Sequence, residues 1–384
     1  MIKPNPFTPQ SGWEPKSFQG RDISIRHFTE TLKKTIETKR PEHMIILGDW
    51  GVGKTSLLKQ FKKITQKEGH LSSYCPIPKF TEKDNSSEII NLIAEEIIKG
   101  FPVINSIKKA MNEIEGIGLS IAGFGGEITR KKKISSPQIF LTDLLLQLWK
   151  HLKVKLAVIL IDDVQNFNEV PQVLDILRLV LSRDEIITKT NYLFVLSSTP
   201  RGWDYFIDKH DPIGRFFRKR ETIQCLSETE TKKVVLETLK NSDVKFENSV
   251  ISRIYPYTKG HPYELQVLCS NLYENQIKGR VSNQQWTAAF NSTIAELGRD
   301  YFASLYRKAT DREETILQVL AGQDDEIDTK TIQLELLKTD KKYPAKDTRF
   351  YIYRLIAKGL VLQKNKGKYQ LIDRMFKEYI LSLT

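Results

Sequence analysis

The chain has 384 residues, 40% of them hydrophobic and 28% charged, which is the composition of an ordinary globular protein with room for two or three domains. No apolar run approaches the roughly eighteen residues that span a bilayer, the N-terminus lacks the apolar core of a secretion signal, and three scattered cysteines fit neither a disulfide framework nor a zinc site. The net charge of +12 favours an anionic partner, nucleic acid first, although a generally lysine-rich composition would give the same value.

We therefore expect buried free thiols, no membrane segment and a cytoplasmic location. Residues 1–20 bear prolines and are expected to be extended. A helical pattern follows from Ile23 to Thr38, with Asp22 at the end where the helix dipole is positive. The short apolar run Met44–Leu47 then predicts a buried parallel strand.

The segment after this strand has the pattern G-x-x-x-x-G-K-T of the phosphate-binding loop of nucleoside triphosphatases. Its glycines let the backbone turn and expose N–H groups to an anion, and the helix expected from Lys54 onward adds its positive end. Lys54 is predicted to reach the phosphates of ATP or ADP, and the Thr55 hydroxyl to hold Mg²⁺. The residues predicted to bind the nucleotide here are Gly48, Asp49, Trp50, Gly51, Val52, Gly53, Lys54, Thr55 and Ser56.

The region before the next buried strand reads as a helix from Ser86 to Lys109, followed by alternating apolar residues and glycines. This alternation predicts a surface hairpin at about residues 112–135, in preference to a loop that touches a membrane. A basic cluster at residues 130–133 either contacts DNA phosphate or, as short charge runs usually are, is simply solvated.

A second apolar strand, Lys155–Ile161, ends in Asp162 and Asp163 at the edge where parallel sheets place their ligands. Many buried strands end in polar residues, but downstream of a phosphate-binding loop this pattern predicts a Walker B motif. Asp162 would then support Mg²⁺ through its water shell. Asp163 stands where a glutamate usually polarises the attacking water, and its shorter side chain predicts slow hydrolysis.

Two further positions are candidates for sensing or completing the nucleotide site. The strand Asn191–Leu196 ends in the hydroxyl residues Ser197, Ser198 and Thr199, which lie either at the nucleotide or in an ordinary turn before Pro200. Arg215, and after it Arg218, could act on the nucleotide of a neighbouring subunit, or belong to a solvated basic turn.

The second half of the chain reads as two helical segments with a basic end. Residues 227–297 are predicted to be all-helical, with Gly260 ending one helix and Pro262 starting the next. After residue 301, three helices and two strands around residues 364–368 predict a winged helix.

The segment Lys338–Lys377 contains twelve basic and three acidic residues, which gives it a net charge of +9. In a DNA-binding winged helix, the third helix would enter the major groove and the wing would contact phosphate or the minor groove. The basic residues of this segment would then lie against the negatively charged DNA. The residues expected to contact DNA are Lys346, Arg349, Arg354, Lys364, Lys366 and Lys368.

Together these motifs resemble the AAA+ and STAND ATPases, especially prokaryotic relatives of the origin-recognition ATPases. The resemblance rests on Gly20-Arg21, the loop 48–55, Asp162-Asp163, the strand end Ser197-Ser198, Gly214-Arg215-Phe216 and Gly260-His261-Pro262. It implies that a polar residue at this strand end senses the γ-phosphate, and Ser198 is our first choice for this residue, ahead of Ser197 and Thr199. It implies that Gly20 and Arg21 lie beside the adenine and that Pro262 packs near the nucleotide in the lid. AAA+ ATPases are expected to carry a sensor 2 arginine in this lid helix, and none is evident in the sequence. This difference favours STAND-like behaviour.

These features predict an α/β P-loop core with a parallel, AAA+-like sheet at residues 1–225, with the inserted hairpin, a helical lid at 226–300 and a winged helix at 301–384. The first hypothesis is an ATP-dependent switch that binds double-stranded DNA and forms homo-oligomers on ATP binding. The second is a STAND-type signalling or defence NTPase whose winged helix is a regulatory clamp. A third is a nucleotide-binding scaffold that hardly hydrolyses. Any destructive chemistry would belong to an effector protein in another chain.

Overall fold

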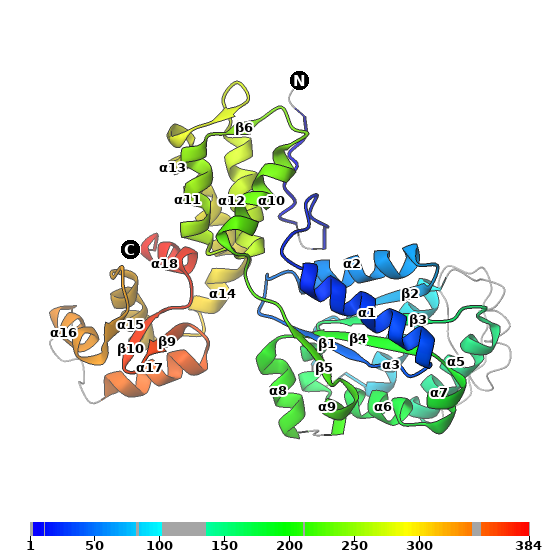
Figure 1. The fold of residues 1–384 in the computed structure, drawn as a ribbon. Coiled ribbons are helices and arrows are strands. Elements are labelled where there is room, and N and C mark those ends of the chain that lie inside the picture. The colour runs from blue at the N-terminus through cyan, green and yellow to red at the C-terminus, as the bar shows by residue number, and fades with distance from the viewer. Residues whose placement is uncertain are drawn as a thin grey trace. The chain divides into compact units, whose positions relative to one another are not determined.

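The computed structural model describes residues 3–10, 12–81, 84–101, 136–209, 212–339 and 347–383 (Figure 1). The hairpin expected at about residues 112–135, the basic cluster 130–133 and Lys346 lie outside the described residues, and so does the side chain of Lys364. The chain divides into two compact units, Arg21–Gln224 and the pair Met1–Gly20 with Cys225–Thr384. The first unit carries the motifs predicted for an ATPase and is called the ATPase core.

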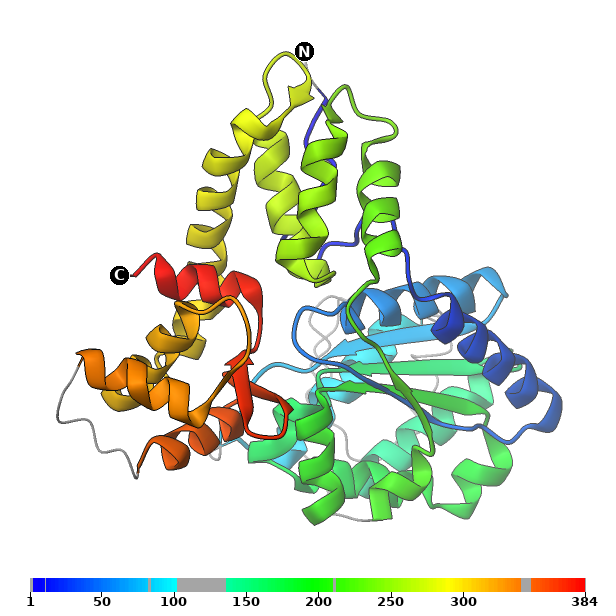
Figure 2. The ribbon, with the colours of Figure 1, turned by 60° about the vertical axis from the view of Figure 1, so that its left-hand side comes forward.

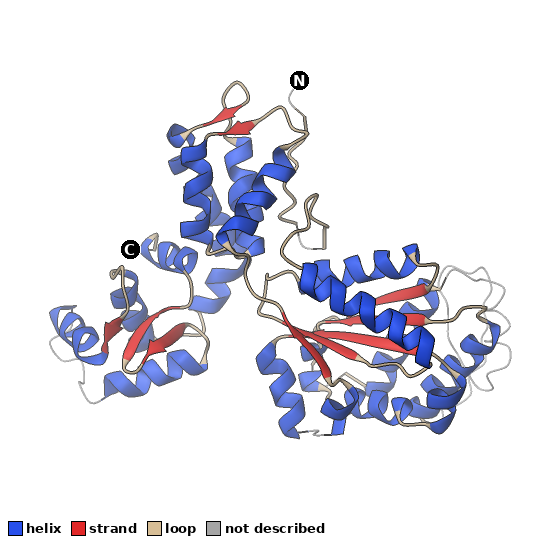
Figure 3. Cartoon of the chain, viewed as in Figure 1, coloured by secondary structure: helices blue, strands red, loops and turns tan. Residues whose placement is uncertain are grey.

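The ATPase core is built on a five-stranded parallel sheet with the strand order β2-β3-β4-β1-β5 (Figure 3). The register aligns Leu47 with Ser198 and Pro76 with Asp162, so the carboxyl ends of β1, β2, β3 and β4 meet at one edge. The strands are β1 Met44–Leu47, β2 Leu71–Pro76, β3 Ala157–Asp162, β4 Tyr192–Ser198 and β5 Lys219–Thr222.

The central strands β1, β3 and β4 are buried along their whole length, as their continuous apolar runs predict. Helices α1 and α2 cover one face of the sheet, where Phe28 stacks on Phe61 with ring centroids 3.9 Å apart. The other face is covered by α3, α5 and α6. The helical elements of this unit are α1 Asp22–Thr38, α2 Lys54–Lys67, α3 Ser86–Gly100, α5 Pro137–His151, the 3₁₀ turn Val164–Glu169, α6 Gln172–Leu181, α7 Asp184–Lys189, α8 Pro200–Lys209 and α9 Pro212–Phe216.

The second unit begins with a group of four helices that pack one against the next (Figure 2). They are α10 Glu228–Leu239, α11 Asn248–Thr258, α12 Pro262–Glu274 and α13 Asn283–Leu297. The prediction of an all-helical segment was wrong in one detail, because β6 (Lys245–Phe246) pairs with β7 (Arg280–Val281). Strands of two residues are too short to leave an alternating pattern in the sequence. The N-terminal segment packs here, with Phe7 stacked on Phe246.

Within its described residues, the C-terminal part carries five helices and a three-stranded sheet of order β8-β10-β9. Phe302, from the π-helical turn Gly298–Phe302, contacts Phe376 and Tyr379 of the last helix, so this part shares one apolar core with the preceding helices. The elements are α14 Ala303–Tyr306, α15 Asp311–Ala321, β8 Ile327–Asp328, α16 Thr329–Thr339, α17 Thr348–Ala357, β9 Val361–Asn365, β10 Lys368–Leu371 and α18 Arg374–Leu381. The sequence did not indicate β8, and the winged-helix interpretation of this order stays a prediction.

Among the described helices, none combines the length and the apolar character that crossing a lipid bilayer requires. The expectation of buried free thiols is confirmed for Cys75 and Cys269 and is wrong for Cys225, which is exposed.

Candidate functional site

The phosphate-binding loop joins the end of β1 to the start of α2 at Lys54. Gly51 and Gly53 have φ angles of 76° and 97°, in the left-handed region that favours glycine. With Gly53 as its N-cap, α2 directs its first N–H groups and the positive end of its dipole towards the loop. The local backbone is therefore arranged to receive an anion.

Lys54 is held inside this loop by the backbone. Its Nζ donates to the carbonyl oxygens of Gly48, at 2.9 Å, and Asp49, at 3.0 Å, and the residue is only 6% exposed. Burial lowers the pKa of Lys54, while the neighbouring carboxylates of Asp163, Asp162 and Asp49 act in the opposite direction. A charged phosphate would add an opposite charge beside this ammonium and favour its protonated form.

Asp162 is the centre of a set of oxygen atoms at the carboxyl edge of the sheet. Its Oδ2 accepts hydrogen bonds from Thr55 Oγ1 and from the Tyr74 hydroxyl, both at 2.7 Å, and Ser197 Oγ donates to Oδ1. Asp162 is 2% exposed. The structure thus brings together Thr55 and Asp162, the two predicted Mg²⁺ residues, and oxygen donors of this kind fit Mg²⁺.

Tyr74 was missed in the sequence because it lies on β2, a strand that no motif marks. Burial raises the pKa of its hydroxyl, and the charge of Asp162 adds to this effect. The hydroxyl therefore stays a hydrogen-bond donor to the carboxylate.

Asp163 turns away from the strand with a φ angle of 60°, a left-handed conformation that is uncommon outside glycine. Gln165 Nε2 donates to its Oδ1 at 2.9 Å, and its own backbone N–H donates to Ser197 Oγ at 3.0 Å. Burial and the adjacent charge of Asp162 raise the pKa of Asp163, against the opposing effects of Gln165 and Lys54. Gln165, a second residue missed in the sequence, also accepts the N–H of Thr199 at 3.2 Å.

The three hydroxyl residues at the end of β4 differ in their contacts with the acidic residues. Ser197, our second choice, contacts both acidic residues, whereas the Ser198 hydroxyl is buried without a hydrogen-bond partner in the described chain. Successive residues of a strand point to opposite faces, so only one of the two serines can face the acidic pair. Thr199 Oγ1 accepts the N–H of Gly202 at 3.1 Å. The geometry therefore favours Ser197 over Ser198 as the residue coupled to the nucleotide site.

The side chain of Arg21 supports the phosphate-binding loop by contacting the loop's backbone. Its Nη2 donates to the carbonyl oxygens of Val52 and Gln224, each at 2.8 Å, and the residue is 8% exposed. Trp50, at the tip of the loop, is 43% exposed and is placed to report on binding by fluorescence. The expected contact of Gly20 and Arg21 with adenine stays a prediction.

The two candidate arginines lie at the opposite edge of the sheet from the phosphate-binding loop. Arg215 and Arg218 are both exposed, and they line a hollow together with residues that precede or begin β1, β4 and β5. The four residues of β1 alone separate the two edges by about 13 Å. Neither arginine therefore serves its own loop, so a role as a finger requires a second copy.

The lid motif begins α12, where His261 is the N-cap and Pro262 the first helical residue. The N–H of Glu264 donates to His261 Nδ1 at 3.5 Å, which gives the motif a capping function. The expected place of Pro262 near the nucleotide stays a prediction.

The expected DNA contacts divide into exposed and engaged residues. Arg349, Lys366 and Lys368 are exposed. Arg354 differs from the prediction, because its Nε pairs with Glu313 Oε1 at 2.9 Å and its guanidinium lies over the Phe350 ring. A cation that already neutralises a buried carboxylate is a poor phosphate ligand.

Comparisons with known proteins agree with this geometry. Residues 22–196 match the KAP family P-loop domain, which is a little under half of the chain. No curated protein sequence matches the chain at a significant level.

Three solved structures show the likeness of the whole fold. The ORC2 protein of Aeropyrum pernix, in ADPNP–ADP complexes, has a TM-score of 0.65 at 14% identity, covering 98% of this chain and 97% of that one. A Walker-type ATPase of Pyrococcus abyssi has a TM-score of 0.61 at 14% identity, covering 98% and 99%. The ORC1 protein of Aeropyrum pernix, in complex with DNA, has a TM-score of 0.50 at 16% identity, covering 98% and 95%. Identities this low concern the fold alone.

The loop, the family match and the parallel sheet define this chain as a P-loop ATPase. Its fold is that of the origin-recognition ATPases of archaea.

Proposed function

We propose that this chain is an ATP-dependent molecular switch that binds double-stranded DNA through its C-terminal part and self-assembles when ATP is bound. The observation that carries the nucleotide part is the contact between Thr55 and Asp162 below a loop that holds Lys54. The similar ORC2 protein was solved with ADPNP and ADP, which supports ATP and ADP as the ligands here. Mg²⁺ held by Thr55 and Asp162 would supply charge neutralisation at the phosphates.

Turnover is proposed to be slow. Asp163 is one methylene shorter than the usual glutamate, and its Oδ1 already accepts a hydrogen bond from Gln165. A raised pKa makes this carboxylate a better proton acceptor, but its reach towards water is limited. Slow hydrolysis suits a switch, in which the lifetime of the ATP state sets the lifetime of the assembled form.

The DNA part of the proposal rests on charge and on fold. The segment Lys338–Lys377 has a net charge of +9, and Arg349, Lys366 and Lys368 are exposed on it. The similar ORC1 protein was solved in complex with DNA. If β9 and β10 form a wing, Lys366 in the turn and Lys368 at the start of β10 would lie on phosphate.

Self-assembly rests on the position of Arg215 and Arg218. Because both lie at the sheet edge away from their own loop, either could complete the nucleotide site of a second copy. Any effector chemistry would then belong to another chain that the assembly recruits.

A second candidate, the STAND-type regulatory NTPase, is favoured by one observation on α17. Phe350 and Tyr353 are 58% and 53% exposed on the outer face of this helix, while Arg354 and Lys358 are paired with Glu313. Exposed aromatic side chains beside neutralised cations suit a protein surface better than a phosphate backbone. In this reading the C-terminal part clamps the switch or holds a protein partner.

The experiment that tests the proposal is fluorescence-anisotropy binding to duplex DNA with ATP, ADP or no nucleotide, across a salt series. We expect salt-dependent binding that differs between ATP and ADP, and no such difference in Lys54→Ala. Lys366→Ala with Lys368→Ala should reduce the salt slope by about 2, since each phosphate contact contributes about one. The matched control removes two exposed lysines of α10, Lys232 and Lys233.

Absence of DNA binding under every nucleotide condition would refute the DNA part and leave the clamp. In that case ATP-dependent association, measured by sedimentation without DNA, would decide whether the switch acts through protein partners.

A further inference from the structure

A cavity of about 660 Å³ opens on the ATPase core at the sheet edge opposite the phosphate-binding loop. Its floor is apolar and buried, with Leu181, Ile186 and Tyr192. A volume of this size is typical of sites for small molecules. The phosphate-binding loop, at the other edge, contributes no residue to it.

The rim of this cavity is strongly basic. Two of its cations come from the segment between α1 and β1, and three from α9, the link that follows it and the start of β5: Lys39, Arg40, Arg215, Arg218 and Lys219. A neighbouring hollow of about 320 Å³ shares Arg215 and Arg218 and adds Arg220. The cations thus form a continuous row along this edge.

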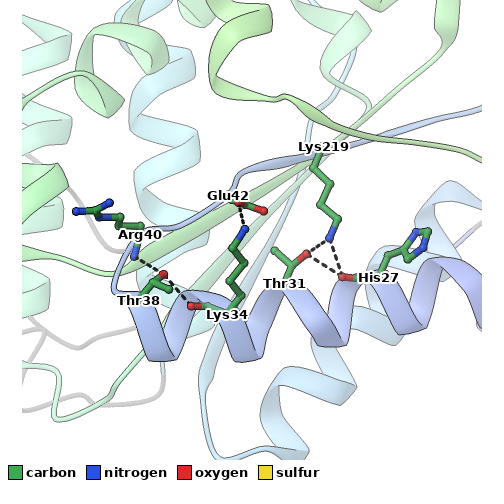
Figure 4. A network of polar contacts seen from close by, with 7 residues as sticks. All are labelled: His27, Thr31, Lys34, Thr38, Arg40, Glu42 and Lys219. Carbon is green, nitrogen blue, oxygen red and sulfur yellow. Dashed lines mark hydrogen bonds and ion pairs between the residues drawn. The ribbon is translucent and has the colours of Figure 1, made fainter.

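The carboxylate on the rim is already neutralised. Glu42 pairs with Lys34 of α1, as Figure 4 shows. The Thr38 hydroxyl accepts the backbone N–H of Arg40 at 3.2 Å, and Lys219 Nζ donates to His27 O at 3.2 Å and to the Thr31 hydroxyl. These contacts fix the rim to α1.

The same network leaves other cations unused. In Figure 4 the guanidinium of Arg40 extends away from the other labelled residues. Within the part of the chain that the structure describes, the side chains of Lys39, Arg40 and Arg218 have no hydrogen-bond or ion-pair partner. Like charges held this close repel each other, so an anion that binds among them gains from all of them at once.

His43 adds a polar but uncharged wall. Burial lowers its pKa to about 4, so the imidazole is neutral at physiological pH. Its Nδ1 accepts the N–H of Phe194 at 3.2 Å, which leaves Nε2 as the ring donor. The wall therefore does not add to the positive charge, and the selectivity for anions comes from the rim.

We propose that this cavity is a second phosphate-binding site of the ATPase core, which takes a polyphosphate group such as the triphosphate of a nucleotide. Guanidinium forks bind phosphate oxygens in pairs, and the apolar floor beside Tyr192 and Phe216 gives room for a base. The polyphosphate comes either as a free molecule or on the nucleotide of a second copy. Binding of a second copy's nucleotide rests on the self-assembly proposed above, whereas binding of a free polyphosphate does not.

The test uses the full chain with Lys54→Ala, which disables the phosphate-binding loop, and calorimetric titration with inorganic tripolyphosphate. For a free ligand we expect one binding event per chain. Lys39→Asn with Arg40→Gln should weaken it at least about tenfold, since two charge-assisted contacts are removed. Asn at residue 39 keeps the left-handed backbone, where φ is 53°. The control pair Lys67→Gln and Lys153→Gln, two exposed lysines of the same unit, should leave the affinity within about twofold.

The second source is tested by mixing. A chain with Lys54→Ala keeps the cavity, and a chain with Lys39→Asn and Arg40→Gln keeps the loop. If the cavity receives a neighbour's nucleotide, the mixture should associate on ATP addition in sedimentation, whereas the cavity variant alone should not.

The proposal is overturned if tripolyphosphate does not bind to Lys54→Ala and the cavity variant alone associates on ATP addition as the unaltered chain does. It is also overturned if the control pair weakens binding as much as the cavity pair. Failure of the proposed function has a different signature, because it would remove the nucleotide effect on DNA binding while leaving tripolyphosphate binding in place.

Discussion

Glu313 is the residue whose replacement tests the C-terminal part most directly. This carboxylate is fully buried and pairs with Arg354 at 2.9 Å and with Lys358 at 2.5 Å. It also accepts the backbone N–H of Thr310 at 2.7 Å, in a capping box that starts α15. Glu313→Gln keeps the shape and removes the charge, so the helix start is preserved while both ion pairs are broken.

The expected cost is about 3 kcal/mol, the lower end of the range for a broken buried ion pair. The lower end applies because the Arg354 side chain is 42% exposed and can regain water. For a unit of this size, about 3 kcal/mol corresponds to a fall in Tm of about 6 to 12 °C. Differential scanning calorimetry of the full chain gives this value.

The pH dependence of the same variant has a definite sign. Burial alone raises the pKa of Glu313, but the hydrogen bonds from Lys358 and Thr310 outweigh it, so the folded pKa lies below the ordinary value of 4.5. A lowered folded pKa gives stability that is present above 4.5 and is lost as the pH falls through the folded value. The difference between wild type and Glu313→Gln should therefore be largest at neutral pH and shrink in acid.

The matched control is Glu335→Gln, which breaks an exposed pair with Lys338 of α16 and should cost less than about 1 kcal/mol. If Glu313→Gln lowers Tm no more than this control, the buried pair does not stabilise the C-terminal part as we argue. If the stability difference between wild type and Glu313→Gln grew as the pH falls, the predicted direction of the pH dependence would be wrong.

Three further replacements probe the candidate site and the predicted lid. Asp163→Asn should leave ATP binding intact and slow hydrolysis by at least about 100-fold, measured by phosphate release, and an unchanged turnover would remove Asp163 from the water-activating role. Tyr74→Phe should weaken Mg-ATP binding by about 3- to 10-fold, read from Trp50 fluorescence, since it removes one hydrogen bond to a carboxylate; no change would make Tyr74 a packing residue only. Gly260→Ala should lower Tm strongly, because its Cβ would lie 1.8 Å from the Leu226 carbonyl oxygen, whereas Gly359→Ala, with a similar φ and open space, should cost only the backbone strain.

The sheet of the ATPase core was predictable because its central strands are buried on both faces. Such strands are continuous apolar runs, and the runs before Gly48 and before Asp162 are of this kind. β2 was not predicted, because Ser72, Ser73 and Tyr74 interrupt its apolar pattern. Two-residue strands such as β8 are fixed by pairing with a distant strand, and local sequence holds no record of that pairing.

The nucleotide site was predictable as far as motifs reach. Lys54, Thr55 and Asp162 come together because the loop and the acidic strand end at the same edge of one sheet. The roles of Tyr74 and Ser197 depend on register and on which face of a strand a residue occupies. A shift of one residue reverses that face, so the choice between two adjacent serines needed the structure.

Counting charges in the sequence treats every basic residue as equal, whereas the structure separates them. Of the twelve basic residues between Lys338 and Lys377, the structure describes the side chains of eight, and four of these are engaged inside the fold. A fifth, Lys338, makes the exposed pair with Glu335. Arg354 and Lys358 hold Glu313, and Arg374 lies over the Tyr257 ring at 4.2 Å. Lys377 donates to Asp324 and to the Gln323 carbonyl oxygen.

At most eight of the twelve basic residues, four of them with side chains outside the described part of the chain, are then left to contact phosphate, which sets a limit on the salt dependence of DNA binding. At about 0.9 per neutralised phosphate, the slope of log K against log salt should be no steeper than about −7. Anisotropy titrations at several salt concentrations measure this slope directly. A steeper slope would mean that cations outside Lys338–Lys377 also lie on the DNA, and the row of arginines and lysines on the ATPase core would be the first place to test. A slope near zero with retained binding would instead point to the exposed Phe350 and Tyr353, since contacts between aromatic rings and bases release few ions.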